Sequence, residues 1–229
     1  TLPKVASGAH FALTASISDS AALNAAADAV KQRAGRCDIL VNSAGFTKPV
    51  AANDLEGLTD ELFDEVVQTN LRGVFATIRA FTPLLKANGD GLIVNVSSIA
   101  GFTGAGSNLA YAASKAGVDV LTKGLAKALA PQVRVIAVSP GVVDSSFVPG
   151  RGAEFNQKAA ATIPLKRIGL IHMFNGMDID QTRNYIKISC PTYIKRVCAK
   201  HLATWMRVSK MPEQPTLLST KQDFLKHFL

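Results

Sequence analysis

The chain carries the segment Ser98-Ile-Ala-Gly-Phe-Thr-Gly-Ala-Gly-Ser-Asn-Leu-Ala-Tyr111-Ala-Ala-Ser-Lys115, which begins where an apolar run, Gly91-Leu-Ile-Val-Asn-Val-Ser-Ser98, ends. A run of this kind predicts a strand of a parallel sheet, buried on both faces. Tyr111 and Lys115 are four residues apart, so they share one face of the helix that their surroundings predict. We therefore expect an α/β fold that places a hydroxyl, a phenol and an ammonium near the carboxyl end of a strand, where open α/β sheets bind ligands.

These three residue types suit proton exchange with a carbonyl or alcohol oxygen. A tyrosine has an ordinary pKa of about 10, and a neighbouring ammonium lowers it, which makes Tyr111 a candidate acid and base. Ser98 could polarise the same oxygen through a hydrogen bond, and a hydride donor would complete the reduction of a ketone. A Tyr and a Lys four residues apart also occur on ordinary helices, with the Lys solvated and the Tyr half buried. The prediction therefore rests on the spacing of Ser98 from the pair.

Periodicity and helix-capping residues predict the remaining elements. The expected elements, in chain order, are a strand over 11–17, a helix over 20–34, a strand over 38–42, a helix over 59–82, a strand over 91–98, a helix over 108–129 and a strand over 133–139. Ser18 or Asp19 can cap the first helix, and Gly35 suits its end. Thr59 can cap the second helix.

Four further motifs occur elsewhere in the chain, in addition to the segment around Tyr111. They read Asp38-Ile-Leu-Val-Asn-Ser-Ala-Gly45, Gln68-Thr-Asn70, Asn95-Val-Ser-Ser98 and Ser139-Pro-Gly-Val-Val-Asp-Ser145. In this order and spacing they resemble the short-chain dehydrogenase/reductase family, especially its 3-oxoacyl-carrier-protein reductases, over about residues 8 to 169. The resemblance implies a Rossmann-like, doubly wound parallel sheet. It also implies hydride transfer between a nicotinamide cofactor, NADP or NAD, and a small ketone or alcohol substrate.

The resemblance assigns roles to individual residues. Tyr111 would be the acid and base, Lys115 would lower its pKa and bind the nicotinamide ribose, and Ser98 would orient the substrate oxygen. Asn70 would distort its helix and hold a water of the proton relay, although an amide on an apolar helix face is more often a satisfied core residue. The implied cofactor-binding residues are Asn42, Ala44, Gly45, Tyr111, Lys115, Pro140, Gly141, Val143 and Ser145.

The segment 146–163 would cover the substrate as a mobile element. Its Phe147, Phe155 and Ile163 are candidate walls of the substrate pocket. Loops carry specificity in such folds, so we expect substrate choice to reside here.

The family pattern begins with a glycine-rich turn, Thr-Gly-x-x-x-Gly-x-Gly, that binds the cofactor pyrophosphate. Before Ala44 this chain has only Gly8 and Gly35. We therefore expect a partial domain in which the strand over 11–17 has no neighbour and the strand over 38–42 exposes an apolar edge. This leaves open a second hypothesis, in which a truncated or chimeric protein retains the catalytic residues without activity.

The end of the chain differs in composition. All four Met and the single Trp follow Gly169, and residues 170–229 hold 9 Lys and Arg against 4 Asp and Glu. We expect a partial dehydrogenase domain over 1–169 and a basic segment of different origin over 170–229, which weakly resembles part of a Copia-type reverse transcriptase. Cys190, Cys198 and His201 have poor spacing for zinc, so we expect no metal site.

Charge and composition limit the partners that we expect. The net charge is +8, but the basic residues over 183–210 are better explained as a solvated face than as a nucleic-acid site. No apolar run is long enough to span a membrane, and three unpatterned Cys suggest a cytoplasmic protein. The family resemblance implies a homodimer or homotetramer that pairs through the helices over 59–82 and 108–129.

Overall fold

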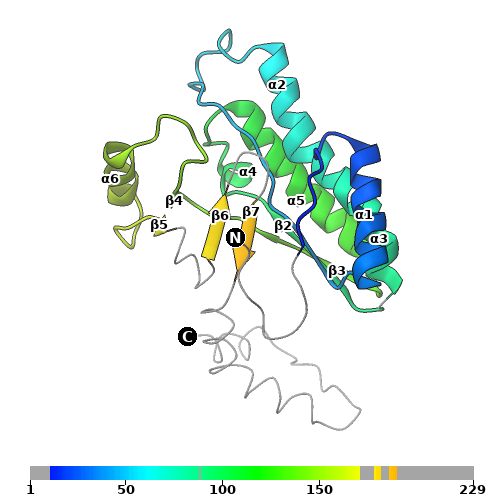
Figure 1. Cartoon of the computed structure of the whole chain (residues 1–229). Helices are drawn as coiled ribbons and strands as arrows, with labels where there is room; N and C mark the ends of the chain where they lie inside the picture. Colours follow the sequence, from blue (N-terminus) through cyan, green and yellow to red (C-terminus); the bar gives the residue numbers. More distant parts are fainter. Residues whose placement is uncertain (1–10, 88, 171–177, 182–185, 190–229) are drawn as a thin grey trace.

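The computed structural model describes residues 11–87, 89–170, 178–181 and 186–189. A parallel three-stranded sheet lies at its centre, with helices packed against it (Figure 1). The elements in chain order are α1 (Ser20–Ala34), β1 (Ile39–Asn42), α2 (Asp60–Val67), the π-helical turn η1 (Gln68–Arg72), α3 (Gly73–Ala87), β2 (Gly91–Val96), α4 (Ala100–Thr103), α5 (Leu109–Leu129), β3 (Val133–Val138), β4 (Val143–Asp144), α6 (Ala153–Thr162), β5 (Gly169–Leu170), β6 (Asp178–Gln181) and β7 (Ile186–Ser189).

The sheet has the order β1-β2-β3, and its register separates two faces. Leu40, Ile93 and Val135 form one row across the three strands, and this row packs with α3 and α5 in the hydrophobic core. The next row contains Val41 and Ile136 and faces the other way. Both of these side chains are exposed, at 41% and 46%.

The expectation that the strands are buried on both faces is therefore wrong for the part of the chain that the structure describes. In Figure 1, α1, α2, α3 and α5 gather on one side of the sheet. The strands still form as apolar runs predict, because one covered face suffices to bury alternate side chains. The expected apolar edge is present, since β1 ends the sheet and its Ile39 is 60% exposed.

The expected strand over 11–17 does not form, and these residues have an irregular backbone. A strand is completed only by hydrogen bonds to a neighbour, and none of the described strands pairs with this segment. The side chain of Ile17 in this segment nevertheless contacts the start of α3. A Cβ added at Gly73 would lie 2.6 Å from Cγ1 of Ile17, so the segment packs closely on the start of α3.

Local capping explains where the helices begin and end. Asp19 accepts hydrogen bonds from the backbone N–H groups of Ala21 and Ala22, and Gly35 closes α1 with a φ of 72°. Thr59 caps α2 as expected. The helix predicted over 59–82 is instead three elements, because the π-helical turn η1 separates α2 from α3, which continues to Ala87.

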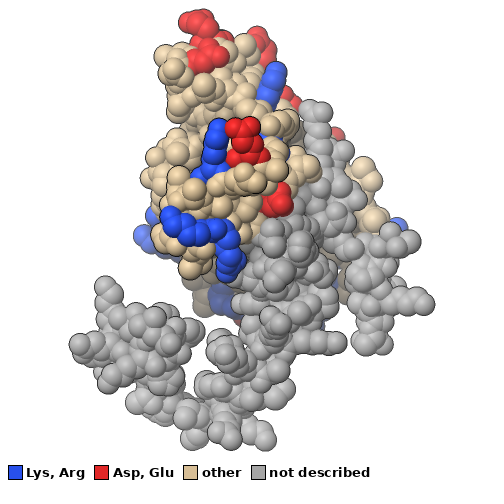
Figure 2. All heavy atoms as spheres, turned by 90° about the vertical axis from the view of Figure 1, so that its left-hand side faces the viewer, with Lys and Arg blue, Asp and Glu red and all other residues tan. Residues whose placement is uncertain are grey.

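The segment expected to be a mobile cover contains a helix, α6, at the side of the molecule where β4 and β5 pair in parallel (Figure 1). Figure 2 views this side, where basic and acidic side chains form small separate groups rather than one continuous basic surface on the described residues. Beyond Leu170 only the backbone hairpin of β6 and β7 is described. Cys190, Cys198 and His201, and most of the basic stretch 183–210, lie outside the described residues. Within the described residues, no helix has the length and apolar character needed to cross a bilayer.

Candidate active site

The structure brings Ser98, Tyr111 and Lys115 together at the carboxyl end of β2. Ser98 follows this strand by two residues, and Tyr111 and Lys115 lie in the first two turns of α5. The helix begins at Asn108, whose Oδ1 accepts a hydrogen bond from the Tyr111 backbone N–H at 2.7 Å. Hydrogen bonding with the Ser98 side chain lowers the pKa of Tyr111. The Lys115 Nζ lies 5.7 Å from the centroid of the Tyr111 ring.

Lys115 is a buried ammonium, with only 5% of the residue exposed. Its Nζ donates a hydrogen bond to the Val96 carbonyl at 2.8 Å. Burial lowers the pKa of Lys115 to about 8, and the charge of Asp119 one turn later opposes this shift. An ammonium has three N–H donors, so among the described residues two are left for other oxygen atoms in addition to the bond with Val96.

Tyr111 departs from one expectation. We expected a pKa below the ordinary value because of Lys115, but burial raises the pKa of Tyr111. The hydrogen bond from Ser98 and the positive charge of Arg151 lower it in part. Desolvation outweighs both, because the low-dielectric surroundings disfavour the phenolate form.

Asn70 lies in η1 and is fully buried, at 0% exposure. Its Oδ1 accepts a hydrogen bond from the Phe46 backbone N–H at 2.7 Å, and its Nδ2 donates to the Phe46 carbonyl at 2.8 Å and to Ser114 Oγ at 3.4 Å. The π-helical turn agrees with the expected distortion of the helix. The side-chain amide is a satisfied core group that fixes the segment around Phe46.

Asn42 has a comparable internal role at the end of β1. Its Nδ2 donates to Asn95 Oδ1 at 2.9 Å, and Asn95 in turn donates to Thr122 Oγ1 at 2.9 Å. This buried chain joins β1, β2 and α5, so the Asn42 amide orients the strand ends from within the core. Ala44 and Gly45 follow, and a Cβ added at Gly45 would lie 3.4 Å from Asn70 Oδ1 and 3.6 Å from the Phe147 ring.

The expected cofactor-binding residues after β3 lie in and beside an irregular segment that contacts the start of α4. Pro140 accepts a hydrogen bond from the Ile99 N–H at 3.0 Å, and a Cβ on Gly141 would lie 3.6 Å from Ile99 Cδ1. Val143 begins β4, and Ser145 Oγ accepts from the Phe147 N–H at 3.3 Å. Of these four residues, Ser145 bonds the backbone of Phe147, whose ring packs on Tyr111.

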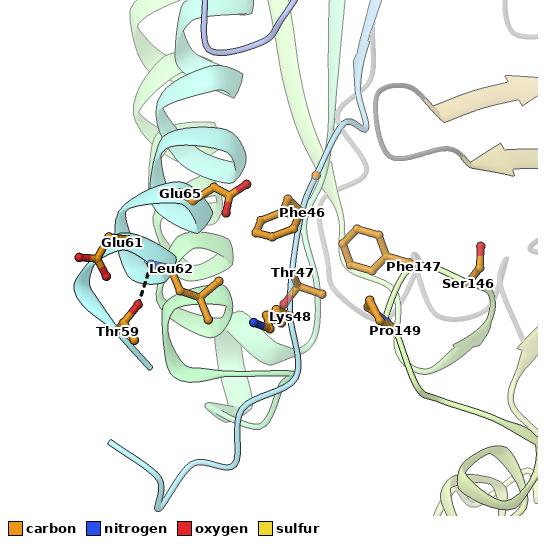
Figure 3. Close-up of a pocket in the computed structure, with 11 residues that line it drawn as sticks. Phe46, Thr47, Lys48, Thr59, Glu61, Leu62, Glu65, Ser146, Phe147 and Pro149 are labelled. Carbon is orange, nitrogen blue, oxygen red and sulfur yellow. Dashed lines mark hydrogen bonds between the residues drawn. The ribbon is translucent and has the colours of Figure 1, made fainter. Parts of the chain in front are cut away.

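A cavity of about 800 Å³ lies between α2, the segment that follows β1 and the loop that carries Phe147 (Figure 3). Its lining residues are Gly45, Phe46, Thr47, Lys48, Thr59, Glu61, Leu62, Glu65, Ser146, Phe147 and Pro149. Phe147 belongs to the cavity wall and also packs on Tyr111, with ring centroids 6.0 Å apart. Phe147, predicted as a wall of the substrate pocket, lines this cavity, whereas Phe155 and Ile163 do not line it.

Comparison with known proteins identifies the group to which this arrangement belongs. The sequence profile described as short chain dehydrogenase matches residues 2–154. The chain belongs to the short-chain dehydrogenase family. Its Rossmann-like α/β fold is shared with solved members. A short-chain dehydrogenase/reductase structure from Burkholderia xenovorans has a TM-score of 0.64 at 37% identity, with 69% of this chain and 63% of that chain covered. The structure of levodione reductase has a TM-score of 0.63 at 32% identity, with 68% of this chain and 63% of that chain covered.

Curated short-chain dehydrogenases show the same relationship. A protein named as ketoacyl reductase 2 of the granaticin polyketide synthase, from Streptomyces violaceoruber, is 37% identical over 157 residues, which are 68% of this chain and 63% of the relative. The 3-oxoacyl-[acyl-carrier-protein] reductase FabG of Staphylococcus aureus is 36% identical over 160 residues, or 69% and 64%. The chain thus spans slightly less than two thirds of the length of these relatives.

Sequence reasoning missed several residues of this short-chain dehydrogenase site. Asn108 holds the cavity wall as well as α5, because its Nδ2 donates to Thr47 Oγ1 at 3.3 Å and to the Lys48 carbonyl at 2.7 Å. Asp119 and Arg151 act on the pKa values of Lys115 and Tyr111. The i, i+4 spacing of Asp119 from Lys115 was a usable signal. No sequence signal pointed to Arg151, because it lies on a loop that is distant from Tyr111 in the sequence.

Proposed function

We propose that this protein is an oxidoreductase that transfers hydride between NADP or NAD and a ketone or alcohol. The observation that carries the proposal is the position of the buried Lys115 ammonium, whose Nζ lies 5.7 Å from the centroid of the Tyr111 ring, with Ser98 at the end of the adjacent strand β2. Membership of the short-chain dehydrogenase family and similarity to ketoacyl and levodione reductases support it.

In the reducing direction, the Tyr111 hydroxyl donates its proton to the carbonyl oxygen and becomes a phenolate. The Ser98 hydroxyl donates a hydrogen bond to the same oxygen while negative charge develops on it. When bound, the nicotinamide cofactor supplies the hydride that adds to the carbonyl carbon. The raised pKa of Tyr111 keeps its proton in place until the oxygen becomes basic, and the charges of Lys115 and Arg151 stabilise the phenolate that remains.

The site suits the nicotinamide end of such a cofactor. Lys115 presents two further N–H donors from a buried position, beyond its bond to Val96, and ribose hydroxyls are suitable acceptors. Gly45 leaves a narrow gap between Asn70 and Phe147, which any larger side chain would fill. The residues that we propose to surround the cofactor are Asn42, Ala44, Gly45, Tyr111, Lys115, Pro140, Gly141, Val143 and Ser145. None of them distinguishes NADP from NAD.

Asn70 has two proposed contributions. Its amide holds the backbone of Phe46, which forms one wall of the cavity. The wide turn of η1 departs from regular helical hydrogen bonding, and such turns recur at functional sites. We propose that this turn holds the water through which Tyr111 is reprotonated.

We also propose that two copies pair through their helices. Phe63 on α2, Phe75 on α3 and Val120 on α5 are exposed, at 41%, 40% and 67%. Large apolar side chains exposed on three packed helices are typical of a subunit interface. Sedimentation equilibrium of the intact chain tests this, and a monomer at all concentrations would contradict it.

The test of the main proposal is turnover by the purified chain. Oxidation of NADPH or NADH is followed optically with a 3-oxoacyl thioester and with simple ketones, for the wild type and for Tyr111→Phe. We expect the variant to keep its circular dichroism spectrum and to lose nearly all activity. Equal turnover by both proteins would contradict the assignment of Tyr111. If neither cofactor binds in calorimetry, the alternative of retained residues without activity is favoured.

A further inference from the structure

Arg151 lies on the loop between β4 and α6, the same loop that carries Phe147. Its backbone N–H donates to the Val148 carbonyl at 3.4 Å, which turns the loop back on itself. Its guanidinium carbon lies 4.3 Å from the centroid of the Phe155 ring. The side chain is half buried, and the Phe155 ring on the following helix supports it from one side. Arg151 is therefore held by its surroundings, unlike a solvated surface arginine.

Arg151 lies four residues after Phe147, on the loop that contacts Tyr111 through the Phe147 ring. Its positive charge lowers the pKa of Tyr111, and Tyr111 in turn raises the pKa of Arg151. The same loop places Phe147 against the Tyr111 ring at 6.0 Å. One loop thus brings an apolar wall and a cation to the proposed acid and base.

Arg151 forms no ion pair within the described part of the chain. The carboxylates nearest to it in sequence have other partners: Glu154 pairs with Lys158 at 2.7 Å, and Asp144 accepts from the Asn156 amide at 2.8 Å. Burial lowers the pKa of Arg151, since its charged form loses water without gaining a carboxylate. A guanidinium in such surroundings favours an external anion, and its planar array of donors matches a carboxylate with two parallel hydrogen bonds.

We propose that Arg151 binds the carboxylate of a keto acid substrate whose carbonyl is reduced at Tyr111. The proposal rests on the proposed function and specifies its substrate class. The protein would therefore select acidic carbonyl compounds over neutral ones of the same shape. The pyrophosphate of the cofactor offers similar anionic oxygens, so the experiment must distinguish the two sources.

The first arm compares keto acids with their methyl esters. 2-Oxo, 3-oxo and 4-oxo acids and the corresponding esters are assayed with the wild type, Arg151→Gln, Arg151→Lys and Arg134→Gln. Arg134 is a suitable control because it is exposed and pairs with Asp90 away from the site. For at least one chain length, we expect the wild type to prefer the acid and Arg151→Gln to lower the acid-to-ester ratio of kcat/KM by about tenfold or more. Arg151→Lys should retain part of the preference, and the control should retain all of it.

Two outcomes of this arm would overturn the proposal. The first is equal use of acid and ester by the wild type at every chain length. The second is an equal loss for acid and ester in Arg151→Gln, because an arginine that only tunes Tyr111 affects both substrates alike.

The second arm measures binding without turnover. Isothermal titration calorimetry follows the preferred keto acid, and separately NADPH and NADH, with the wild type and Arg151→Gln. We expect the variant to lose affinity for the keto acid while cofactor affinity stays unchanged. Loss of cofactor affinity alone would assign Arg151 to the pyrophosphate and overturn the proposal. Keto acid binding that depends on Arg151 in a chain without turnover would support this inference while contradicting the proposed function.

Discussion

Lys115 and Asp119 lie one turn apart on α5, both buried, with only 5% and 7% of each residue exposed. The charge of Asp119 raises the pKa of Lys115 against the larger effect of burial, which leaves it at about 8. Oδ2 of Asp119 has no hydrogen-bond partner within the described residues. The carboxylate charge therefore acts on Lys115 while this oxygen accepts no hydrogen bond from the described residues.

Replacing Asp119 by Asn should lower the pKa of Lys115 further. The ammonium would then lose its proton at a lower pH, and reduction of the substrate should decline at a lower pH than in the wild type. The pH dependence of kcat/KM for the wild type and Asp119→Asn measures this shift. Asp90→Asn is the control, because Asp90 is exposed and pairs with Arg134. Identical profiles for the wild type and Asp119→Asn would show that Asp119 does not act on the reaction through Lys115.

The burial of Lys115 also predicts how stability depends on pH. Its pKa falls from 10.5 to about 8 on folding, so between these values the unfolded chain binds more protons than the folded one. The free energy of unfolding should therefore rise with pH across this window, by about 3 kcal/mol from this group alone. Below pH 8 both states are charged and the contribution is constant. Urea unfolding at several pH values tests this for the wild type and Lys115→Met, and a slope that persists in Lys115→Met would assign it to other groups.

The hydrogen bonds of Asn70 predict a large loss of stability when its amide is removed. Asn70→Ala would remove the buried amide that bonds both the N–H and the carbonyl of Phe46, at a cost of about 2 to 4 kcal/mol. Asn156→Ala is the matched control, because Asn156 bonds an exposed carboxylate and should cost less than about 1 kcal/mol. Chemical denaturation gives both values, and equal losses would contradict the role of Asn70 in fixing the cavity wall.

Replacement of two glycines near the site by alanine should affect stability differently. A Cβ on Gly101 would lie 2.8 Å from the Ala116 backbone nitrogen and 2.9 Å from the Lys115 carbonyl carbon. Gly101→Ala should push α4 away from α5 and destabilise the protein by about 1 to 3 kcal/mol. At Gly45 the contacts are 3.4 Å or longer, so Gly45→Ala should leave stability nearly unchanged. Thermal melts compare the two variants, and a loss for Gly45→Ala as large as for Gly101→Ala would show that the tight packing at Gly101 is not decisive.

The local elements could be predicted from the sequence because their signals are local. Asp19 and Gly35 bound α1, and Thr59 starts α2, as their capping chemistry predicts. Alternating or continuous apolar runs located β1, β2 and β3 to within about a residue or two. The π-helical turn that interrupts the expected helix over 59–82 was not located as a separate element, since hydrogen-bond spacing within a helix leaves no plain mark in hydrophobic periodicity.

By itself, the sequence determined the family and the alternation of strands and helices that gives a parallel sheet. It also determined which residues, Ser98, Tyr111 and Lys115, lie near the end of one strand. These follow from residue spacing along single elements. Tertiary structure alone decided the irregular path of 11–17, the engagement of Asn70 with Phe46, and the approach of Arg151 to Tyr111. It also decided the direction of the Tyr111 pKa, because that depends on how much water the fold removes from the phenol and which charges lie near it. Burial and proximity between distant segments arise only when the chain has folded.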